Sequence, residues 1–181
     1  MAQTWARKRR GKLVRNDPYT KVDALAARRV LRDAYRARQE LAKAFQSEVM
    51  TTHRLRWLTV ITLLRAVGHA LDSVDVRRSL LMKEAAKAAW SRWRQIPLHH
   101  LIFHEFIKRE RDLVLKEYRF TTRRVTAGEP VEAAETIGPS TVLLIGDRSY
   151  SALEAVDAAL AWWEAEISQI EHEAGATRRQ G

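Results

Sequence analysis

Long segments without glycine or proline constrain this chain more than any other feature of its sequence. Only seven glycines and four prolines occur in 181 residues, and neither residue type lies between positions 20 and 49. Across that segment apolar residues recur at steps of three, four and seven, a spacing that places them on one face of a helix. We therefore expect a long first helix, and we exclude a collagen-like, low-complexity or loop-dominated chain. The face predicted to be buried carries Leu31, Tyr35, Ala42, Phe45 and Val49.

Four further helices are expected along the chain. The run 72–75 supplies N-cap candidates, Pro97 marks a helix boundary, and Ser151 with Glu154 forms a capping box. The four helices are predicted at about 51–71, 75–95, 97–120 and 151–173. The apolar stripe of the last one consists of Leu153, Val156, Leu160, Trp163, Ile167 and Ile170.

A β-prone segment separates the fourth helix from the last. Phe120–Val125 and Thr141–Ile145 flank a turn at Gly128–Pro130, which predicts a small β-hairpin inserted at about 120–147. The predicted fold is mainly all-α: an up-and-down bundle of four to five long helices, with this hairpin before the last helix. The predicted organisation is a basic flexible arm at 1–18, a single helical domain at 19–175 and a frayed tail at 176–181.

The formal net charge of +10 is distributed unevenly. Residues 1–128 hold 29 basic and 12 acidic residues, or +17, whereas residues 129–181 hold 3 basic and 10 acidic residues, or −7. Either the acidic segment folds back onto basic helices, or the basic body faces a polyanion. The candidate nucleic-acid contacts are Arg7, Lys8, Arg9, Arg10 and Lys12 in the arm, and Arg28, Arg29, Arg32 and Arg36 on the outer face of the first helix.

Several classes of protein are excluded or disfavoured. The chain has no cysteine, which excludes disulfides, thiolate metal sites and a cysteine nucleophile. The most apolar stretch, 55–71, is interrupted by Arg56, Arg65 and His69, so we expect a buried helix and no transmembrane segment. The basic N-terminus lacks the apolar run of a secretory signal, which predicts a cytoplasmic protein. No phosphate-loop, dinucleotide, nucleophile-elbow or Glu-x-x-His motif occurs, and we expect neither a metal nor a cofactor.

Two carboxylates lie on the predicted inward face of the fourth helix. Glu110 and Glu117 share an arc with Phe103, and so does His99. Buried carboxylates need partners. Arg65 and His69, one turn apart on the second helix, are the expected ones. These side chains either form a buried polar network that fixes helix register or build an active or ligand site.

The stretch 83–94 interleaves cations with tryptophans. Such a pattern stacks on unpaired bases while neutralising phosphates, or it places tryptophans in a core. Trp93 shares a stripe with Ala86 and Ala89 and is expected in the core, whereas both interpretations stay open for Trp90.

The segment from Arg94 to His99 (Arg-Gln-Ile-Pro-Leu-His) resembles the Arg-x4-His signature of HEPN domains, with Gln95 where such motifs carry Asn or Asp and with Pro97 inside it. HEPN domains are small helical bundles, many of them metal-independent RNases of toxin or defence systems that act as dimers. The resemblance implies that Arg94 contacts the phosphate and that His99 assists attack by the ribose 2′-hydroxyl. This chemistry suits an arginine and a histidine.

Two functions follow as expectations. The first is a basic, HEPN-like helical bundle associated with nucleic acid, RNA rather than DNA. The alternative is a non-catalytic protein-interaction or structural module with a buried ionic network, whose partner is another protein or a second copy. We favour a non-enzyme, and a metal-independent RNase is the expectation if the chain is an enzyme.

Overall fold

The computed structural model describes residues 24–47, 49–117, 123–126, 129–131 and 137–177. Within this part the α-helices are α1 (Ala26–Ala44), α2 (Met50–Ser73), α3 (Leu80–Gln95), α4 (Arg109–Glu117) and α5 (Ala152–Thr177). Three further helical segments of other geometry are η1 (Asp75–Arg77), η2 (Pro97–His100) and η3 (Ile102–Lys108). The strands are β1 (Arg123–Thr126), β2 (Glu129–Val131), β3 (Thr141–Ile145) and β4 (Arg148–Ser151). The predicted mainly α-helical bundle, with a β element before the last helix, is confirmed.

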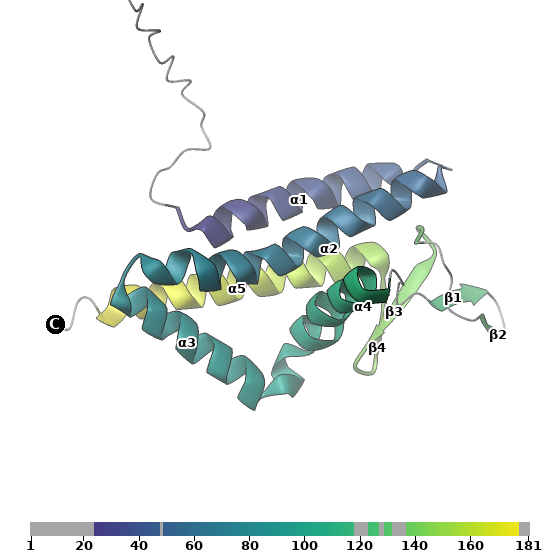
Figure 1. Cartoon of the computed structure of the whole chain (residues 1–181). Coiled ribbons are helices and arrows are strands. Elements are labelled where there is room, and N and C mark those ends of the chain that lie inside the picture. Colours follow the sequence, from purple (N-terminus) through teal and green to yellow (C-terminus); the bar gives the residue numbers. More distant parts are fainter. Residues whose placement is uncertain (1–23, 48, 118–122, 127–128, 132–136, 178–181) are drawn as a thin grey trace, which may run out of the picture.

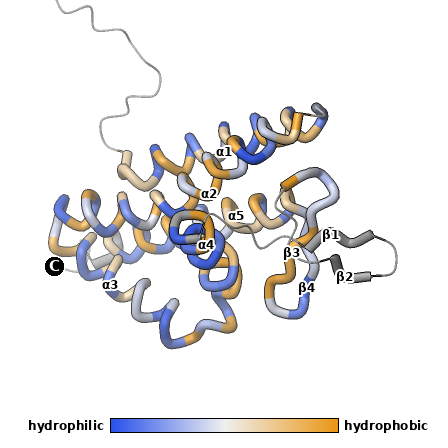
Figure 2. Tube along the Cα trace, turned by 45° about the vertical axis from the view of Figure 1, so that its right-hand side comes forward, coloured by the Kyte–Doolittle hydropathy of each residue, from blue (hydrophilic) through white to orange (hydrophobic). Residues whose placement is uncertain are grey.

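The helices form two layers around one core. α1, α2 and α5 run side by side, and α3 and α4 form a V beneath them (Figure 1). Hydrophobic and hydrophilic residues recur in alternating groups along the helices, as expected of amphipathic helices (Figure 2). Trp57, Trp93 and Trp163 are completely buried between the layers. The core position predicted for Trp93 is therefore correct.

The buried face of α1 matches the predicted one only in part: Leu31 is buried and Phe45 packs against the core, as predicted. Tyr35 and Val49 are 40% and 55% exposed, and α1 ends at Ala44, before Val49. The prediction followed the larger apolar side chains, whereas four of the six buried residues of α1 are alanines. The buried residues of α1 are Ala27, Leu31, Ala34, Ala37, Leu41 and Ala44.

Asp75 caps a helix, but not the predicted one. The third helix begins later, at Leu80, where the Ser79 hydroxyl accepts the Met82 N–H at 3.1 Å. Asp75 lies in η1, and its two carboxylate oxygens each accept a backbone N–H from the first turn of α1, Ala26 and Ala27, at 2.8 Å. Because α1 has no side-chain cap of its own, this distant carboxylate satisfies its free amides and complements its dipole.

The predicted fourth helix is three segments of different geometry. Pro97 opens the 3-10 turn η2, the chain widens into the π-helix η3, and regular α-helix begins only at Arg109. These changes of pitch shift the helical phase, so the inward placement predicted for His99 is wrong. His99 is exposed, and its neighbour His100 is buried. Phe103 within η3 and Glu110 within α4 face inward as predicted.

The β element is larger than the predicted hairpin. The strands form one antiparallel sheet in the order β2-β1-β3-β4, and β4 extends it to Ser151. Gly146, with φ of +60°, turns the chain between β3 and β4, a conformation that favours glycine. Its N–H donates to Glu105 of η3 at 2.6 Å, which ties the sheet to the helices.

The capping box of α5 is confirmed. The Ser151 N–H donates to the Glu154 carboxylate at 2.7 Å, and the Glu154 N–H donates back to the Ser151 hydroxyl at 3.3 Å. The predicted basic arm and the last four residues of the predicted tail lie outside the described residues. Among the residues described, no helix combines the length and the apolar character needed to cross a membrane.

Candidate functional site

The acidic helix α5 folds back onto the basic helices. Its carboxylates pair with Arg28 and Arg38 of α1 and with Arg92 of α3. Arg38 makes a two-pronged contact with Asp157, at 2.6 and 2.7 Å. Of the two arrangements compatible with the charge asymmetry, fold-back of the acidic segment is therefore realised for these arginines.

This pairing changes the set of cations free to meet an external anion. Arg28 pairs with Glu164 and, at 2.8 Å, with Glu171. The hydrogen bond that Arg28 donates to Glu171 raises the pKa of Arg28, so this guanidinium is engaged within the fold. Arg29 and Arg32 remain exposed on the outer face of α1, as predicted.

The remaining predicted contacts are divided between α1 and the arm. Arg36 is exposed and lies 3.2 Å from Asp33, one turn away on the same helix. The five cations of the arm lie outside the described residues; they are Arg7, Lys8, Arg9, Arg10 and Lys12.

Uncompensated positive charge gathers between α2 and α3. The two helices diverge from η1 (Figure 1), and a groove of about 590 Å³ lies between them. Four cations line it, Arg65, Lys83, Lys87 and Arg94, together with the single carboxylate of Asp72. Within the described part of the chain, no carboxylate forms an ion pair with any of these four cations. An anion is therefore the ligand that this groove favours electrostatically.

Small side chains give the groove its depth. Gly68 lies on its α2 wall, and a Cβ there would stand 2.9 Å from Cη2 of Trp163 and 3.3 Å from Nη1 of Arg65. Ala86 lines the α3 wall and is completely buried. The close approach of Trp163 thus requires glycine at position 68, and the absence of a side chain there deepens the groove.

The four residues of the predicted polar network are not all buried. Glu110 is 1% exposed, as predicted, whereas His69 is exposed and Arg65 is half-buried. Arg65 and His69 line the groove together, so the structure brings this pair to a surface site and not to a buried network. The side chain of Glu117 lies outside the described part of the chain.

Arg94 and His99 occupy different environments. Arg94 lines the groove, and its Nε donates to the Trp90 carbonyl at 3.3 Å. His99 is exposed on η2 and is not among the residues that line the groove. Of the two residues that carry the HEPN resemblance, only Arg94 therefore lies in the groove.

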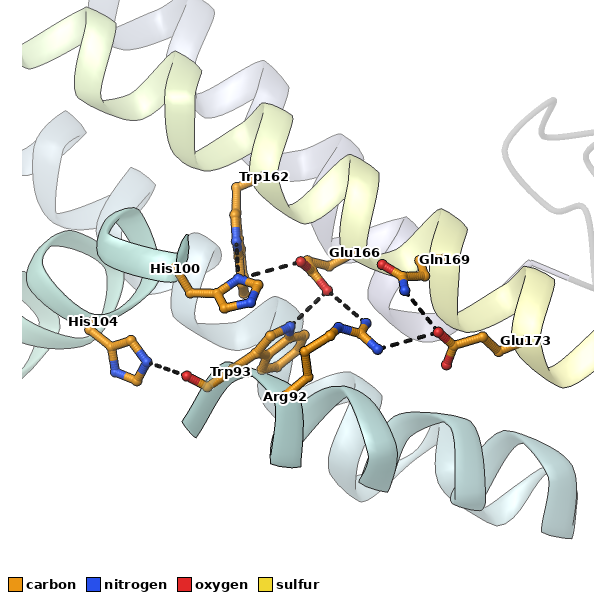
Figure 3. A network of polar contacts seen from close by, with 8 residues as sticks. All are labelled: Arg92, Trp93, His100, His104, Trp162, Glu166, Gln169 and Glu173. Atoms are coloured by element: carbon orange, nitrogen blue, oxygen red, sulfur yellow. Dashed lines mark hydrogen bonds and ion pairs between the residues drawn. The ribbon is translucent and has the colours of Figure 1, made fainter. Parts of the chain in front are cut away.

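A buried polar network does exist, on residues that the sequence interpretation did not select. The Trp93 indole N–H donates to Glu166 at 2.7 Å, Arg92 donates to the same oxygen at 3.3 Å, and Glu166 is 7% exposed (Figure 3). Glu166 interrupts the apolar stripe of α5, three residues after Trp163 and four before Ile170, and that interruption was the available signal. The network joins α3 to α5.

His100 completes this network as a neutral imidazole. Its Nδ1 accepts the Trp162 indole N–H at 3.1 Å, so the lone pair on Nδ1 is already used (Figure 3). The Glu166 carboxylate lies 3.5 Å from the same nitrogen, which is long for a hydrogen bond, and a proton on Nδ1 would clash with the indole N–H of Trp162. Burial lowers the pKa of His100 and outweighs the opposite influence of the Glu166 carboxylate. Trp162 is partly buried against the core.

A second, smaller pocket of about 400 Å³ lies on η3 and α4. It carries His104, Lys108 and Lys116 beside Asp112. Asp112 accepts a hydrogen bond from Arg111 at 2.6 Å, which lowers the pKa of the carboxyl, and it lies 3.6 Å from Lys116. In this pocket the carboxylate pairs with a lining cation, whereas the four cations of the groove form no ion pair within the described residues.

No family model, curated protein or solved structure matches the chain. Among the described residues, no three histidine, aspartate or glutamate side chains gather as a metal site would require.

Proposed function

We propose that this protein binds nucleic acid, RNA in preference to DNA, through the groove between α2 and α3. The observation that carries the proposal is the set of four cations, Arg65, Lys83, Lys87 and Arg94, that face one groove without an ion-pair partner among the described residues. Phosphate groups are the ligands that such a set binds, and their contacts dominate the affinity of nucleic-acid-binding proteins. The preference for RNA rests on the HEPN resemblance.

The proposed activity is binding without cleavage. In the RNase mechanism that the resemblance implies, Arg94 and His99 act on one phosphate. Arg94 lines the groove, but His99 is exposed outside it, and this separation supports a binding protein. His99→Ala should then leave RNA affinity unchanged, and the purified protein should leave RNA intact with and without divalent ions. Cleavage that disappears in His99→Ala would instead establish the RNase.

The binding site is tested with two variants of equal net charge. Lys83→Gln/Lys87→Gln removes two cations from the groove, and Arg29→Gln/Arg32→Gln removes two from the exposed face of α1. Affinity for a labelled single-stranded RNA, measured by fluorescence anisotropy over a salt series, should fall at least tenfold in the groove variant at low salt. Its log–log salt slope should decrease by about 1.4, or about 0.7 for each lost contact to a single strand.

The control variant on α1 should lose less than about threefold, because its cations lie away from the groove. Equal losses in the two variants would show that binding follows net charge and not the groove. A wild-type protein that binds neither RNA nor DNA at low salt would overturn the proposal. The alternative function, a protein-interaction module held by a buried ionic network, is supported by the Glu166 network. It predicts that the wild-type protein binds neither RNA nor DNA.

A further inference from the structure

The α3 wall of the groove presents a tryptophan within a row of cations. Lys83, Lys87, Trp90 and Arg94 follow one another at steps of four, three and four residues and all line the groove. At about 100° per residue these positions fall within about 60° of one another on the helix. At 1.5 Å per residue the row extends about 16 Å along α3. An aromatic ring therefore stands between cations along one line.

Trp90 is held in place by the aromatic cluster behind it. Its ring meets Trp93 edge-on at a centroid distance of 4.5 Å and Phe103 edge-on at 5.8 Å. Trp93 is completely buried and Phe103 is 5% exposed, so neither neighbour can easily move. Trp90 itself is half-buried and lines the groove. Such a fixed ring binds a flat partner at a smaller entropic cost than a mobile one.

The dimensions of the groove select the form of the nucleic acid. A volume of about 590 Å³ lies within the range of sites that hold one small ligand. Beside the indole of Trp90 the lining includes the small residues Gly68 and Ala86, which leave room for a flat base. An unpaired strand offers such a base directly, whereas a duplex must first break a base pair at a cost of a few kcal/mol.

We infer that the groove holds an unpaired nucleotide of a single strand, with its base stacked on Trp90 and the adjacent phosphates bound by Lys83, Lys87 and Arg94. This inference rests on the proposed function and adds to it the form of the ligand. Inorganic phosphate would use the cations but leave the indole without a partner. A base joined to phosphates uses both features of the wall.

The first test compares Trp90→Leu with Trp90→Phe in the full chain. Leucine keeps an apolar side chain but removes the π-face, whereas phenylalanine retains a face for stacking. We expect Trp90→Leu to bind a 12-nucleotide single-stranded RNA at least tenfold more weakly than the wild type, and Trp90→Phe to lose less than threefold. Affinity for a duplex of equal length should be the same in all three proteins, since a paired base does not enter the groove.

A second measurement does not depend on the folding of a variant. A wild-type complex with the same RNA carrying 5-bromouracil is irradiated, digested with trypsin and examined by mass spectrometry. Cleavage after Lys87 and Arg92 releases Trp90 in the peptide Ala88–Arg92. We expect the cross-link in that peptide, and not at the completely buried Trp57 or Trp163.

The outcomes separate this inference from the proposed function. If Lys83→Gln/Lys87→Gln weakens binding, but Trp90→Leu does not and the cross-link maps elsewhere, phosphate binding stands and stacking on Trp90 is refuted. If no nucleic acid binds, both fail. Polyglutamate serves as the control for an acidic peptide. If polyglutamate of equal charge competes with the single-stranded RNA, and if Trp90→Leu weakens its binding as much as that of the RNA, the inference is overturned in favour of a protein ligand.

Discussion

Replacing Glu166 by alanine tests whether the buried network holds α3 to α5. The carboxylate accepts the Trp93 indole N–H at 2.7 Å, and both side chains are buried. Leaving that N–H without an acceptor costs about 1–3 kcal/mol. Loss of one buried methylene group adds about 0.8 kcal/mol. We therefore expect Glu166→Ala to lower the free energy of unfolding by about 2–4 kcal/mol, and Tm by about 4–16 °C.

Two further variants make this measurement specific. Glu166→Gln retains the volume and one acceptor oxygen and should cost only about 1–1.5 kcal/mol. Asp157→Ala removes a carboxylate from the same helix that pairs with Arg38 but is 50% exposed, and it should cost less than about 1 kcal/mol. Guanidinium unfolding followed by circular dichroism gives all three values. If Glu166→Ala costs no more than Asp157→Ala, the buried indole–carboxylate bond does not stabilise the fold.

Three other changes probe separate contacts. Asp75→Ala should lower the free energy of unfolding by about 2–3 kcal/mol, because two α1 amides lose a charged acceptor; a urea curve like that of the wild type would refute this cap. Gly68→Ala should cost about 1–3 kcal/mol by the same assay, since its Cβ would press on Trp163, and a neutral result would show that the ring yields. The lowered pKa of His100 means that the unfolded chain binds more protons, so stability should fall as the pH drops through about 6.5 and level off below the folded pKa. His100→Gln should flatten this dependence, and parallel curves for the two proteins would contradict it.

Periodicity located most of the helices but not always the face that each one buries. The buried face of α1 consists largely of alanines such as Ala27 and Ala34, whereas a prediction weighted toward larger side chains selected Tyr35. A helix packed through small residues gives a weak apolar pattern, because alanine is common on both faces of helices. The face that such a helix buries is decided by the helix packed against it, and a local sequence pattern carries no information about that neighbour.

The segment after Pro97 shows a second limit. A constant 100° per residue assumes one helical geometry, whereas the chain passes through a 3-10 turn and a π-helix before Arg109. His99 lies within the 3-10 turn and was misplaced, while Glu110 lies beyond both irregular segments, within the regular helix, and was placed correctly. Asp75 illustrates a third limit, because it caps a helix that begins 49 residues earlier in the chain.

Part of the groove could be predicted from the sequence. Its α3 wall lies in the cationic and aromatic stretch 83–94, and Arg65 with His69 on its α2 wall was also singled out. What the sequence could not indicate is that α2 and α3 diverge, so that two stripes expected to serve separate purposes face each other. Nor does the sequence indicate that Trp163 of α5 lies against Gly68.

The charges of this groove oppose folding, which supports a role in binding. Lys83 and Lys87 are one turn apart on α3, where like charges destabilise a helix by about 0.2–0.5 kcal/mol, and Arg65 faces them from α2. A carboxylate at position 87 would attract Lys83 and Arg65 but repel Glu84, which lies three residues earlier on the same helix. Lys87→Glu should therefore change the free energy of unfolding by less than about 0.5 kcal/mol at low salt, while it weakens RNA binding at least tenfold. Lost binding with little change in stability is expected of a cation kept for its ligand. A variant that lost both stability and binding would mean that Lys87 supports the fold, and the groove would then lose its main argument for function.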